Sequence, residues 1–506
     1  MAAVTAAGTK TSPAETEIKL CLAPTLARRL RRHPAIRQRP RTRARLRSIY
    51  FDTGDAALFQ RGIALRLRRV GRRWVQAIKA GRGSGGAQSE RIEWETPVPG
   101  RRLTLDALPS DAQAIIPPEV VAALAPRFET DVQRETWQIE RADALIEIAL
   151  DQGEARAGER AMPISEVELE LKAGDVGTLF ELAERLAADL PFQLEPRSKA
   201  QRGYQLTGDL ALAPVKADLP TLSLDQPADA AFQRIARSCL RQFEANLPGF
   251  LAEADPDPEY VHQMRVALRR LRAAIGLLRF MGRPAPDWVG ELKWLMGELA
   301  AARDWDVFVT ETLPRVRASL EQPERLDGLL DAATALRHQA NIRARTAVAS
   351  PRLTRLWLKL SRELATLPPA TLTAAEWSQA ALQWRYRQVT RLGRRLETLD
   401  ATGRHALRIA AKKLRYAAEF FAERHLKPAR RFLRRLATLQ EALGVLNDAA
   451  VTARLLDEAK QAGGSAVWEA AGLVVGFLAC EQRHRLARLG RLWKRFHKAP
   501  SYWAQG

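Results

Sequence analysis

Charged and apolar residues alternate between Glu15 and Lys19, in a spacing that suits the binding of a metal ion and an anion. Successive side chains of a β-strand point to opposite faces, so Glu15, Glu17 and Lys19 would share one face of a strand. Two carboxylates and an ammonium on one face do not fit an ordinary buried sheet. They indicate either the polar lumen of a barrel or a strand with one solvated side.

Later segments of the first half repeat this alternation, which bears on the choice between the two. A solvated strand face usually mixes Thr, Ser, Gln and Lys, whereas these faces carry mainly carboxylates, Arg and Lys. Gathering fixed charges of both signs is costly unless they pair or hold ions and a charged ligand. A closed antiparallel barrel whose apolar sides pack outward on helices would produce the pattern. The segments are residues 65–68, 74–79, 91–95, 128–140, 144–151 and 166–172.

The segment before the second expected strand is strongly basic. Residues 24–47 predict a helix followed by a basic, proline-containing loop. The aromatic and β-branched residues 48–53 predict a strand, which ends at the turn Gly54-Asp55.

An ordered set of motifs over residues 13–208 resembles the CYTH superfamily, also called triphosphate tunnel metalloenzymes. The resemblance implies an α+β domain with an eight-stranded antiparallel β tunnel that binds a triphosphate and a divalent metal. The family includes inorganic triphosphatases, thiamine triphosphatases, adenylate cyclases and RNA triphosphatases. The motifs are Glu15-x-Glu17-x-Lys19, Tyr50-Phe51-Asp52-Thr53, Leu65-Arg66-Leu67-Arg68, Lys79, Arg91-x-Glu93, Arg134-x-x-Trp137, Asp151-x-Gly153, Glu166-x-Glu168-x-Glu170, and Lys199 with Arg202-Gly203-Tyr204.

The roles expected of these residues follow from charge. Phosphoryl transfer relies on positioning and charge neutralisation, and the fork of arginine suits phosphate oxygens. The cations expected to bind substrate are Lys19, Arg66, Arg68, Lys79, Arg134 and Lys199. The expected ligands of Mg²⁺ or Mn²⁺ are Glu15, Glu17, Glu168 and Glu170, with Asp151 and Glu166 as weaker candidates. Catalysis is expected to depend on Glu15, Glu17, Lys79 and Glu168. One metal would clamp the phosphate chain, and a second metal or a glutamate would activate water.

The second half of the chain has a helical period and an internal duplication. After a proline-containing linker, residues 209–221, Ala/Leu/Arg-rich stretches replace the alternating pattern. His262 and Arg265 head a cationic stripe at helical spacing, and His405 and Arg408 head a second one. Such a stripe on one helix is often only a solvated face, but its recurrence favours a shared anion site.

These residues resemble the CHAD domain, a conserved histidine α-helical domain, over residues 222–500. The resemblance implies an all-α domain of two four-helix repeats, about 222–365 and 366–500, around a basic channel that binds inorganic polyphosphate. The residues expected to bind it are His262, Arg265, Arg269, Arg272, His405, Arg408, Lys412, Lys413 and Arg415.

The composition predicts a multidomain globular protein with an anionic partner. The chain has 506 residues, 46% of them hydrophobic, and a formal net charge of +22. Three widely separated cysteines favour a reducing compartment. The first residues lack an apolar core typical of signal peptides, and the longest apolar run, residues 470–480, is too short for a membrane span. We therefore expect a cytoplasmic protein that has no membrane partner and needs no disulfide.

Three functions remain open from the sequence. The first is a metal-dependent hydrolase of inorganic triphosphate or a related short phosphate chain, with polyphosphate bound by the helical half. The second is a non-catalytic polyphosphate-binding protein that targets polyphosphate granules. A nucleic-acid binder is disfavoured, because the basic helices carry no recognition motif and no aromatic stacking pattern. The sequence does not predict the oligomeric state.

Overall fold

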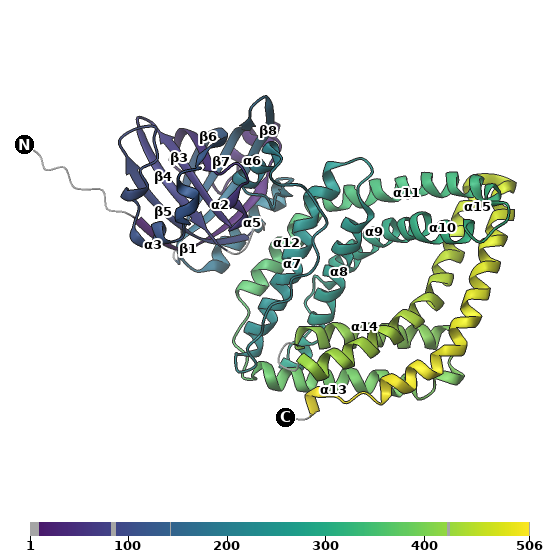
Figure 1. Ribbon diagram of the computed structural model, residues 1–506. Helices are drawn as coiled ribbons and strands as arrows, with labels where there is room; N and C mark the ends of the chain where they lie inside the picture. The colour runs from purple at the N-terminus through teal and green to yellow at the C-terminus, as the bar shows by residue number, and fades with distance from the viewer. Residues whose placement is uncertain (1–9, 82–87, 142, 423–425, 505–506) are drawn as a thin grey trace, which may run out of the picture. The chain divides into compact units, whose positions relative to one another are not determined.

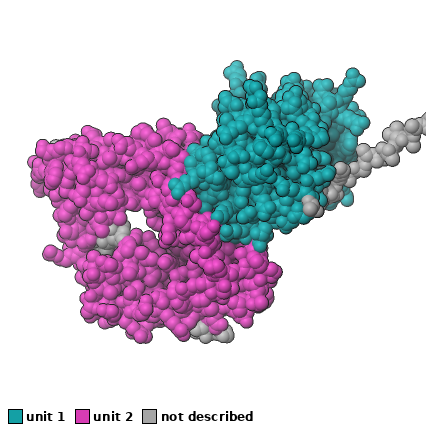
Figure 2. Space-filling model, turned by 180° about the vertical axis from the view of Figure 1, so that it is seen from behind, with its two compact units in different colours: residues 1–213, 247–249, 349–366 teal, residues 214–246, 250–348, 367–506 magenta. Residues whose placement is uncertain are grey.

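The computed structural model describes residues 10–81, 88–141, 143–422 and 426–504, and the chain divides into two compact units. Unit 1 comprises residues 1–213, 247–249 and 349–366, and unit 2 comprises residues 214–246, 250–348 and 367–506 (Figures 1 and 2).

Unit 1 is built around a closed antiparallel β-barrel. Strand β1 pairs with β8 on one side and with β5 on the other, so the order β5-β4-β3-β2-β6-β7-β8-β1 closes on itself. A two-residue strand, β9 (Gln193–Leu194), adds to β1. The predicted eight-stranded barrel is thus confirmed, with one short strand added. The strands are β1 (Lys10–Cys21), β2 (Arg41–Asp52), β3 (Ile63–Val70), β4 (Arg73–Ala80), β5 (Gln88–Val98), β6 (Ala125–Arg141), β7 (Ala144–Ala157) and β8 (Arg160–Gly174).

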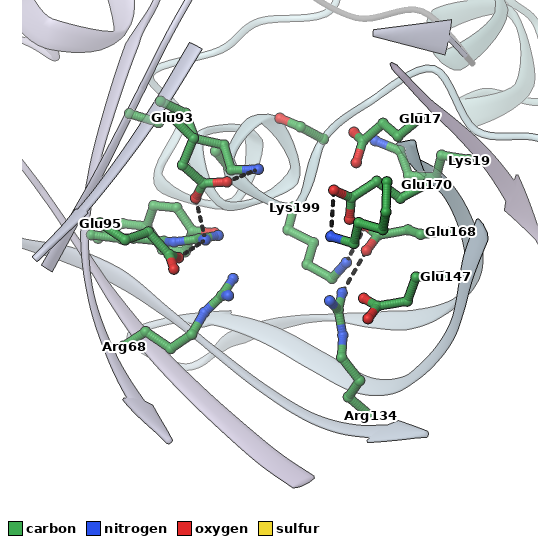
Figure 3. Close-up of a pocket in the computed structure, with 17 residues that line it drawn as sticks. Glu17, Lys19, Arg68, Glu93, Glu95, Arg134, Glu147, Glu168, Glu170 and Lys199 are labelled. Carbon is green, nitrogen blue, oxygen red and sulfur yellow. Dashed lines mark hydrogen bonds and ion pairs between the residues drawn. The ribbon is translucent and has the colours of Figure 1, made fainter. Parts of the chain in front are cut away.

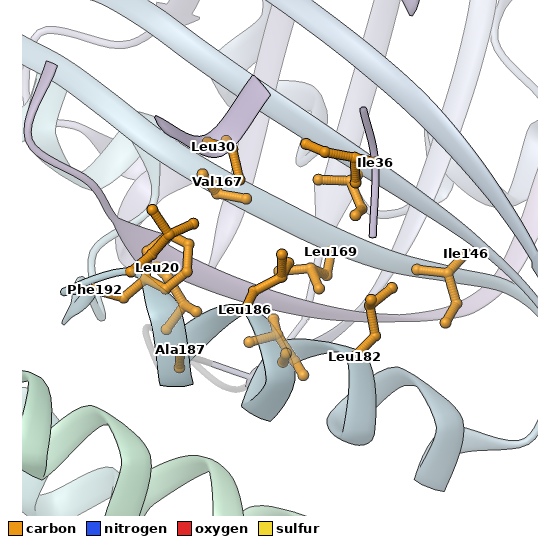
Figure 4. Close-up of a cluster of buried hydrophobic side chains, with 14 of the residues drawn as sticks. Leu20, Leu30, Ile36, Ile146, Val167, Leu169, Leu182, Leu186, Ala187 and Phe192 are labelled. Atoms are coloured by element: carbon orange, nitrogen blue, oxygen red, sulfur yellow. The ribbon is translucent and has the colours of Figure 1, made fainter. Parts of the chain in front are cut away.

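The apolar faces of several strands point outward and pack on a helix, as the alternation predicted. Val167 and Leu169 of β8 lie in one cluster with Leu182 and Leu186 of α5 (Val176–Asp189) (Figure 4). The Asp175 side chain caps this helix by accepting the backbone N–H of Thr178. Each fully buried leucine contributes about 1.5–3 kcal/mol, so this outer layer holds the barrel wall while the lumen stays polar.

Strand β2 begins at Arg41, and the prediction of a loop up to residue 47 was wrong. Arg45 and Arg47 form ion pairs with Asp131 and Glu129 of the neighbouring strand β6, each at 2.7 Å. The alternating arginines of this segment therefore form cross-strand ion pairs on the outer face of the barrel. The basic composition of the segment gave no sign of these carboxylate partners, because they lie on another strand.

The helix α6 (Lys199–Thr207) closes against the barrel and carries two site residues at its start. Ser198 and Gln201 form a capping box, which fixes the first turn of the helix. Gly203 lies against the ring of Phe128, where a Cβ atom would come within 2.0 Å of the ring. The remaining short helices of unit 1 are η1 (Pro24–Leu26), α1 (Ala27–Arg31), α2 (Ala57–Gln60), η2 (Leu105–Ala107), α3 (Ser110–Ala114) and α4 (Pro118–Val121).

Unit 1 also contains a helix from much later in the chain, α12 (Pro351–Ala365). Leu358 belongs to the same apolar cluster as α5, and the Thr354 hydroxyl donates to the Phe192 carbonyl at 2.8 Å. Arg362 pairs with Glu184 of α5 at 3.3 Å. The sequence assigned residues 349–365 to the first helical repeat, whereas their contacts group them with the barrel.

Unit 2 is helical, as predicted, and its helices fall into two successive sets. The helix α15 contains a non-helical residue, Gly464 (φ 71°, ψ −161°), which divides it into two helices. Within the described residues, four long helices, α7, α8, α9 and α11, thus precede four others, α13, α14 and the two parts of α15. The bounds are α7 (Ala228–Ala252), α8 (Pro258–Ile275), α9 (Val289–Val307), α10 (Leu313–Arg317), α11 (Asp327–Val348), α13 (Ala374–Gly393), α14 (Ala401–Phe420) and α15 (Leu426–His497).

Candidate active site

The barrel encloses a cavity of about 380 Å³, and most of the residues that line it are charged (Figure 3). Cations and carboxylates line it in nearly equal numbers, so the cavity suits a ligand that itself combines negative and positive charge. The cations are Lys19, Arg66, Arg68, Lys79, Arg134, Lys172 and Lys199, and the carboxylates are Glu17, Glu93, Glu95, Glu147, Glu168 and Glu170.

Three of the carboxylates form a row across neighbouring strands, which we call the acidic row. Glu170 of β8 lies directly opposite Glu17 of β1 and Glu147 of β7 in the strand register. Like charges in such positions repel. Burial raises the pKa of Glu170, and Glu147 and Glu17 add to this, although the Lys172 ammonium at 2.5 Å opposes it. A divalent cation would relieve this repulsion, although the three carboxylates do not all bring oxygen atoms within 4.8 Å of one another.

A second group of carboxylates lies deeper and is already neutralised by protein cations. Among the described residues, only Asp151, Glu166 and Glu168 bring oxygen atoms within 4.8 Å of one another in a group of three. The Lys199 ammonium lies 2.7 Å from Asp151 and 2.8 Å from Glu168, and it also bonds Glu166. Burial disfavours this ammonium, but the three carboxylates outweigh that effect and raise its pKa. This group is more compact than the acidic row, and a metal ion bound there would have to displace the Lys199 ammonium from its oxygens.

The same carboxylates orient Arg134. Its guanidinium donates to both oxygens of Asp151, at 2.7 and 2.6 Å, and to Glu168 at 2.5 Å. Asp151 is fully buried and does not line the cavity, but it belongs to the compact group of three carboxylates, so its role as a metal ligand stays a prediction. Its position also suits it to fix the direction of Arg134 and Lys199.

On the opposite wall, a buried carboxylate joins two cations. Glu93 accepts from Arg66 at 2.7 Å and from Lys79 at 2.7 Å, and Arg66 lies 3.5 Å from Glu95. Burial opposes ionisation of Glu93, but Arg66 and Lys79 outweigh it and lower its pKa to about 2. Glu93 therefore stays ionised and holds both cations in place at neutral pH.

Two cations at the cavity have no carboxylate partner within 4 Å among the described residues. Arg68 points into the cavity from β3, and its one hydrogen bond to the described residues is a long one, 3.4 Å, to the Ser48 hydroxyl (Figure 3). Burial, with Arg66 and Arg134 nearby, lowers the pKa of Arg68 to about 10. Lys19 donates to a backbone carbonyl at 3.0 Å, and burial lowers its pKa. These two groups carry positive charge that an anion in the cavity would neutralise.

The structure gathers most of the predicted residues at one site. The cavity lining includes all six predicted substrate-binding cations together with Glu17, Glu168 and Glu170. The side chain of Glu15 lies outside the described residues. The prediction omitted Glu93, Glu95, Glu147 and Tyr50 from the site, although the two-residue alternation of their strands places them on lumen faces.

In unit 2, the structure brings three predicted residues of α8 together with Arg303 of α9, which the prediction omitted. Arg265 is buried, and its pKa falls to about 10 through burial and the nearby Arg269 and Arg303. Burial and the same arginines lower the pKa of His262. Asp304 lies 4.0 Å from Arg265. Arg303 also pairs with Glu311 at 3.0 Å, and Glu259 lies near His262, so the positive charge of this cluster is partly compensated.

The two duplicated helices, α8 and α14, also meet directly. Arg270 of α8 and Arg415 of α14 both pair with Glu419, at 3.4 and 3.2 Å. Partial desolvation lowers the pKa of Lys413, although the residue is exposed, and Arg385 and Arg272 contribute to this shift. His262 is half-buried whereas its counterpart His405 is exposed, so the two copies are not equivalent. Arg408 and Lys412, also predicted to bind polyphosphate, are half-buried on α14.

Two family descriptions match the chain: "CYTH domain" over residues 13–204 and "CHAD domain" over residues 234–457. The crystal structure of the CHAD domain from the plant Ricinus communis is 34% identical, covers 57% of this chain and 99% of its own, and superimposes with a TM-score of 0.51. The chain joins a CYTH domain to a CHAD domain.

A relative of the CYTH domain has a named activity. The inorganic triphosphatase of Haemophilus influenzae is 36% identical over 166 residues, which are 32% of this chain and 46% of the relative. The match thus spans less than half of that protein. PptA from Streptomyces chartreusis is 19% identical, with 53% of this chain and 100% of its own covered, and its TM-score of 0.43 is too low to carry an argument. None of the helices in the described part of this CYTH–CHAD chain is long and apolar enough to cross a membrane.

Proposed function

We propose that the CYTH domain hydrolyses inorganic triphosphate, or a related short phosphate chain, in the barrel cavity with Mg²⁺ or Mn²⁺. The observation that carries the proposal is the charge arrangement of the enclosed cavity. Arg68 and Lys19, which lack carboxylate partners among the described residues, share this cavity with the acidic row. A short phosphate chain with its metal ion supplies the missing charge of both signs. The match to an inorganic triphosphatase supports the same assignment.

The residues of the cavity divide the work by charge. Arg68 and Lys19 bind phosphate oxygens, and Lys199 and Arg134 contact the chain from positions that Asp151 fixes. A metal ion held by the acidic row would neutralise phosphate oxygens and lower the pKa of a bound water. Water then attacks a terminal phosphorus in line with the leaving oxygen, and a lumen glutamate accepts its proton.

We further propose that the CHAD domain binds inorganic polyphosphate. The buried Arg265 with Arg269 and Arg303, and the group of Lys413 with Arg272, supply the positive charge for this role. Both domains then act on phosphate chains. In the alternative, the barrel does not turn over and the protein only binds polyphosphate, at granules for example.

Phosphate release tests the proposal and separates it from the alternative. We expect turnover of triphosphate, in the presence of Mg²⁺ or Mn²⁺ and not after chelation, when triphosphate, ATP, thiamine triphosphate and polyphosphate are compared. Glu17→Ala should remove this activity while the circular dichroism spectrum is unchanged. Absence of metal-dependent release from all four compounds, with polyphosphate still bound, would favour the binding protein. Preference for duplex DNA over polyphosphate would contradict both.

A further inference from the structure

Arginines are concentrated in one segment of the CYTH domain that takes no part in the cavity. Residues 28–47 contain ten arginines and no carboxylate, whereas the average content of Lys and Arg, 80 in 506 residues, would place about three there. Nine of the ten side chains are exposed. We call this segment the arginine surface. A charge excess of this size needs an explanation beyond solubility.

Buried side chains anchor the first part of the arginine surface. Leu30 and Ile36 belong to the apolar cluster between the barrel and α5 (Figure 4). Between them, the buried His33 bonds Asp189 through Nε2 at 2.9 Å and accepts the Ala35 N–H at Nδ1. The arginines between and beside these anchors therefore project from a fixed frame, which reduces the entropy lost when they bind a ligand.

The arginines of strand β2 have carboxylate partners, and so does Arg31 of α1, which pairs with Glu135 at 2.8 Å. Arg41 and Arg43 lie 3.2 and 3.4 Å from Glu135, and Arg45 and Arg47 pair with carboxylates of β6 as described above. By contrast, no ion pair within the described residues involves the five exposed arginines that precede β2. They are Arg28, Arg29, Arg32, Arg37 and Arg39. The segment before the strand therefore carries uncompensated charge.

The chemistry of the segment favours a phosphate chain without bases. Arginine forks bind phosphate oxygens in pairs. Residues 23–47 contain no Phe, Tyr or Trp, so the surface has no platform on which nucleobases could stack. We propose that the arginine surface is a second binding site for long-chain inorganic polyphosphate, on the outside of the barrel. It shares its ligand class with the proposed function but none of its residues, so each can fail without the other.

Arginine modification of the full chain, read residue by residue, tests the proposal. The protein is treated with phenylglyoxal, and modification is measured by mass spectrometry with long-chain polyphosphate, inorganic triphosphate or single-stranded DNA of equal charge concentration. We expect polyphosphate to slow the modification of Arg28, Arg29 and Arg32 by about tenfold, a factor that corresponds to about 1.4 kcal/mol. Triphosphate should not protect them. The exposed arginines Arg72 and Arg102 serve as internal references and should react equally in every sample.

A pair of matched variants adds an independent check. In Arg28→Gln/Arg29→Gln/Arg32→Gln, polyphosphate should no longer protect Arg37 and Arg39, whereas Arg72→Gln/Arg73→Gln/Arg102→Gln should leave that protection intact. Both variants should retain triphosphate hydrolysis. Equal modification with and without polyphosphate would overturn the proposal, as would equal or stronger protection by DNA. If the wild-type protein, without phenylglyoxal treatment, does not hydrolyse triphosphate, this result would count against the proposed function alone.

Discussion

Replacement of Arg68 by glutamine should affect substrate turnover and the stability of the empty protein in opposite directions. Without substrate, burial and neighbouring cations disfavour the charged guanidinium, and its pKa falls from 12.5 to about 10. A shift of this size corresponds to roughly 3 kcal/mol of unfavourable interaction at neutral pH. The variant removes that term, so we expect the empty CYTH domain to unfold at an equal or higher temperature.

In the proposed complex with triphosphate, the same side chain would form charge-assisted hydrogen bonds with phosphate oxygens. Such bonds contribute about 1.5–3 kcal/mol, which predicts a loss of roughly 10- to 150-fold in kcat/KM. The assay is phosphate release under saturating metal, with the melting temperature measured on the same preparations. Arg69→Gln, on the outer face of the same strand, is the matched control and should behave as wild type. The reasoning fails if Arg68→Gln matches the control in kcat/KM, or if it loses activity only because it melts early.

Three further changes test other parts of the barrel. The pKa of Glu93 falls from 4.5 to about 2, so its ionised form stabilises the fold by about 3 kcal/mol above pH 4.5. This stabilisation is lost as the pH falls toward 2. When the stability of Glu93→Gln is measured over the same pH range, that decrease should be absent. Glu147→Gln should raise the metal concentration needed for half-maximal activity by about tenfold yet slightly raise the melting temperature of the metal-free protein, because repulsion in the acidic row is relieved. Gly203→Ala should lower the melting temperature, at a cost of about 1–3 kcal/mol, because its methyl group meets the Phe128 ring; Gly297→Ala, with open space around it, should not.

The sequence predicted the barrel well because strand alternation has a simple period. Glu166, Glu168 and Glu170 alternate with Val167 and Leu169, and the structure places the first set inward or buried among charges and the second in the outer core. It could not predict which carboxylates neutralise one another, because that depends on strand register. Lys199 lies among Asp151, Glu166 and Glu168 only because α6 packs back onto the barrel.

Long-range packing also explains the largest difference between the domain organisation predicted from the sequence and that of the structure. The strongly amphipathic α12 follows the helices of the first repeat without a composition change, so nothing in its own sequence separates it from them. Its assignment to unit 1 rests on Leu358 and Thr354 meeting residues more than 160 positions earlier, such as Phe192. Similarly, the strand residues 41–47 looked like a loop because their carboxylate partners lie on β6.

The membership of α12 in unit 1 has a consequence for how this protein can be divided or duplicated. A gene fragment that stops near residue 208 ends after the last motif of the CYTH domain but omits the helix that covers α5. In such a fragment, the apolar residues that pack around Leu358 would be exposed to water, which favours aggregation, even though every residue of the cavity is present. A soluble excised barrel would need residues 349–366 supplied as a separate peptide or grafted through a short connection. Recombination at the apparent domain border is thereby disfavoured, which would tend to keep the two domains in a single polypeptide.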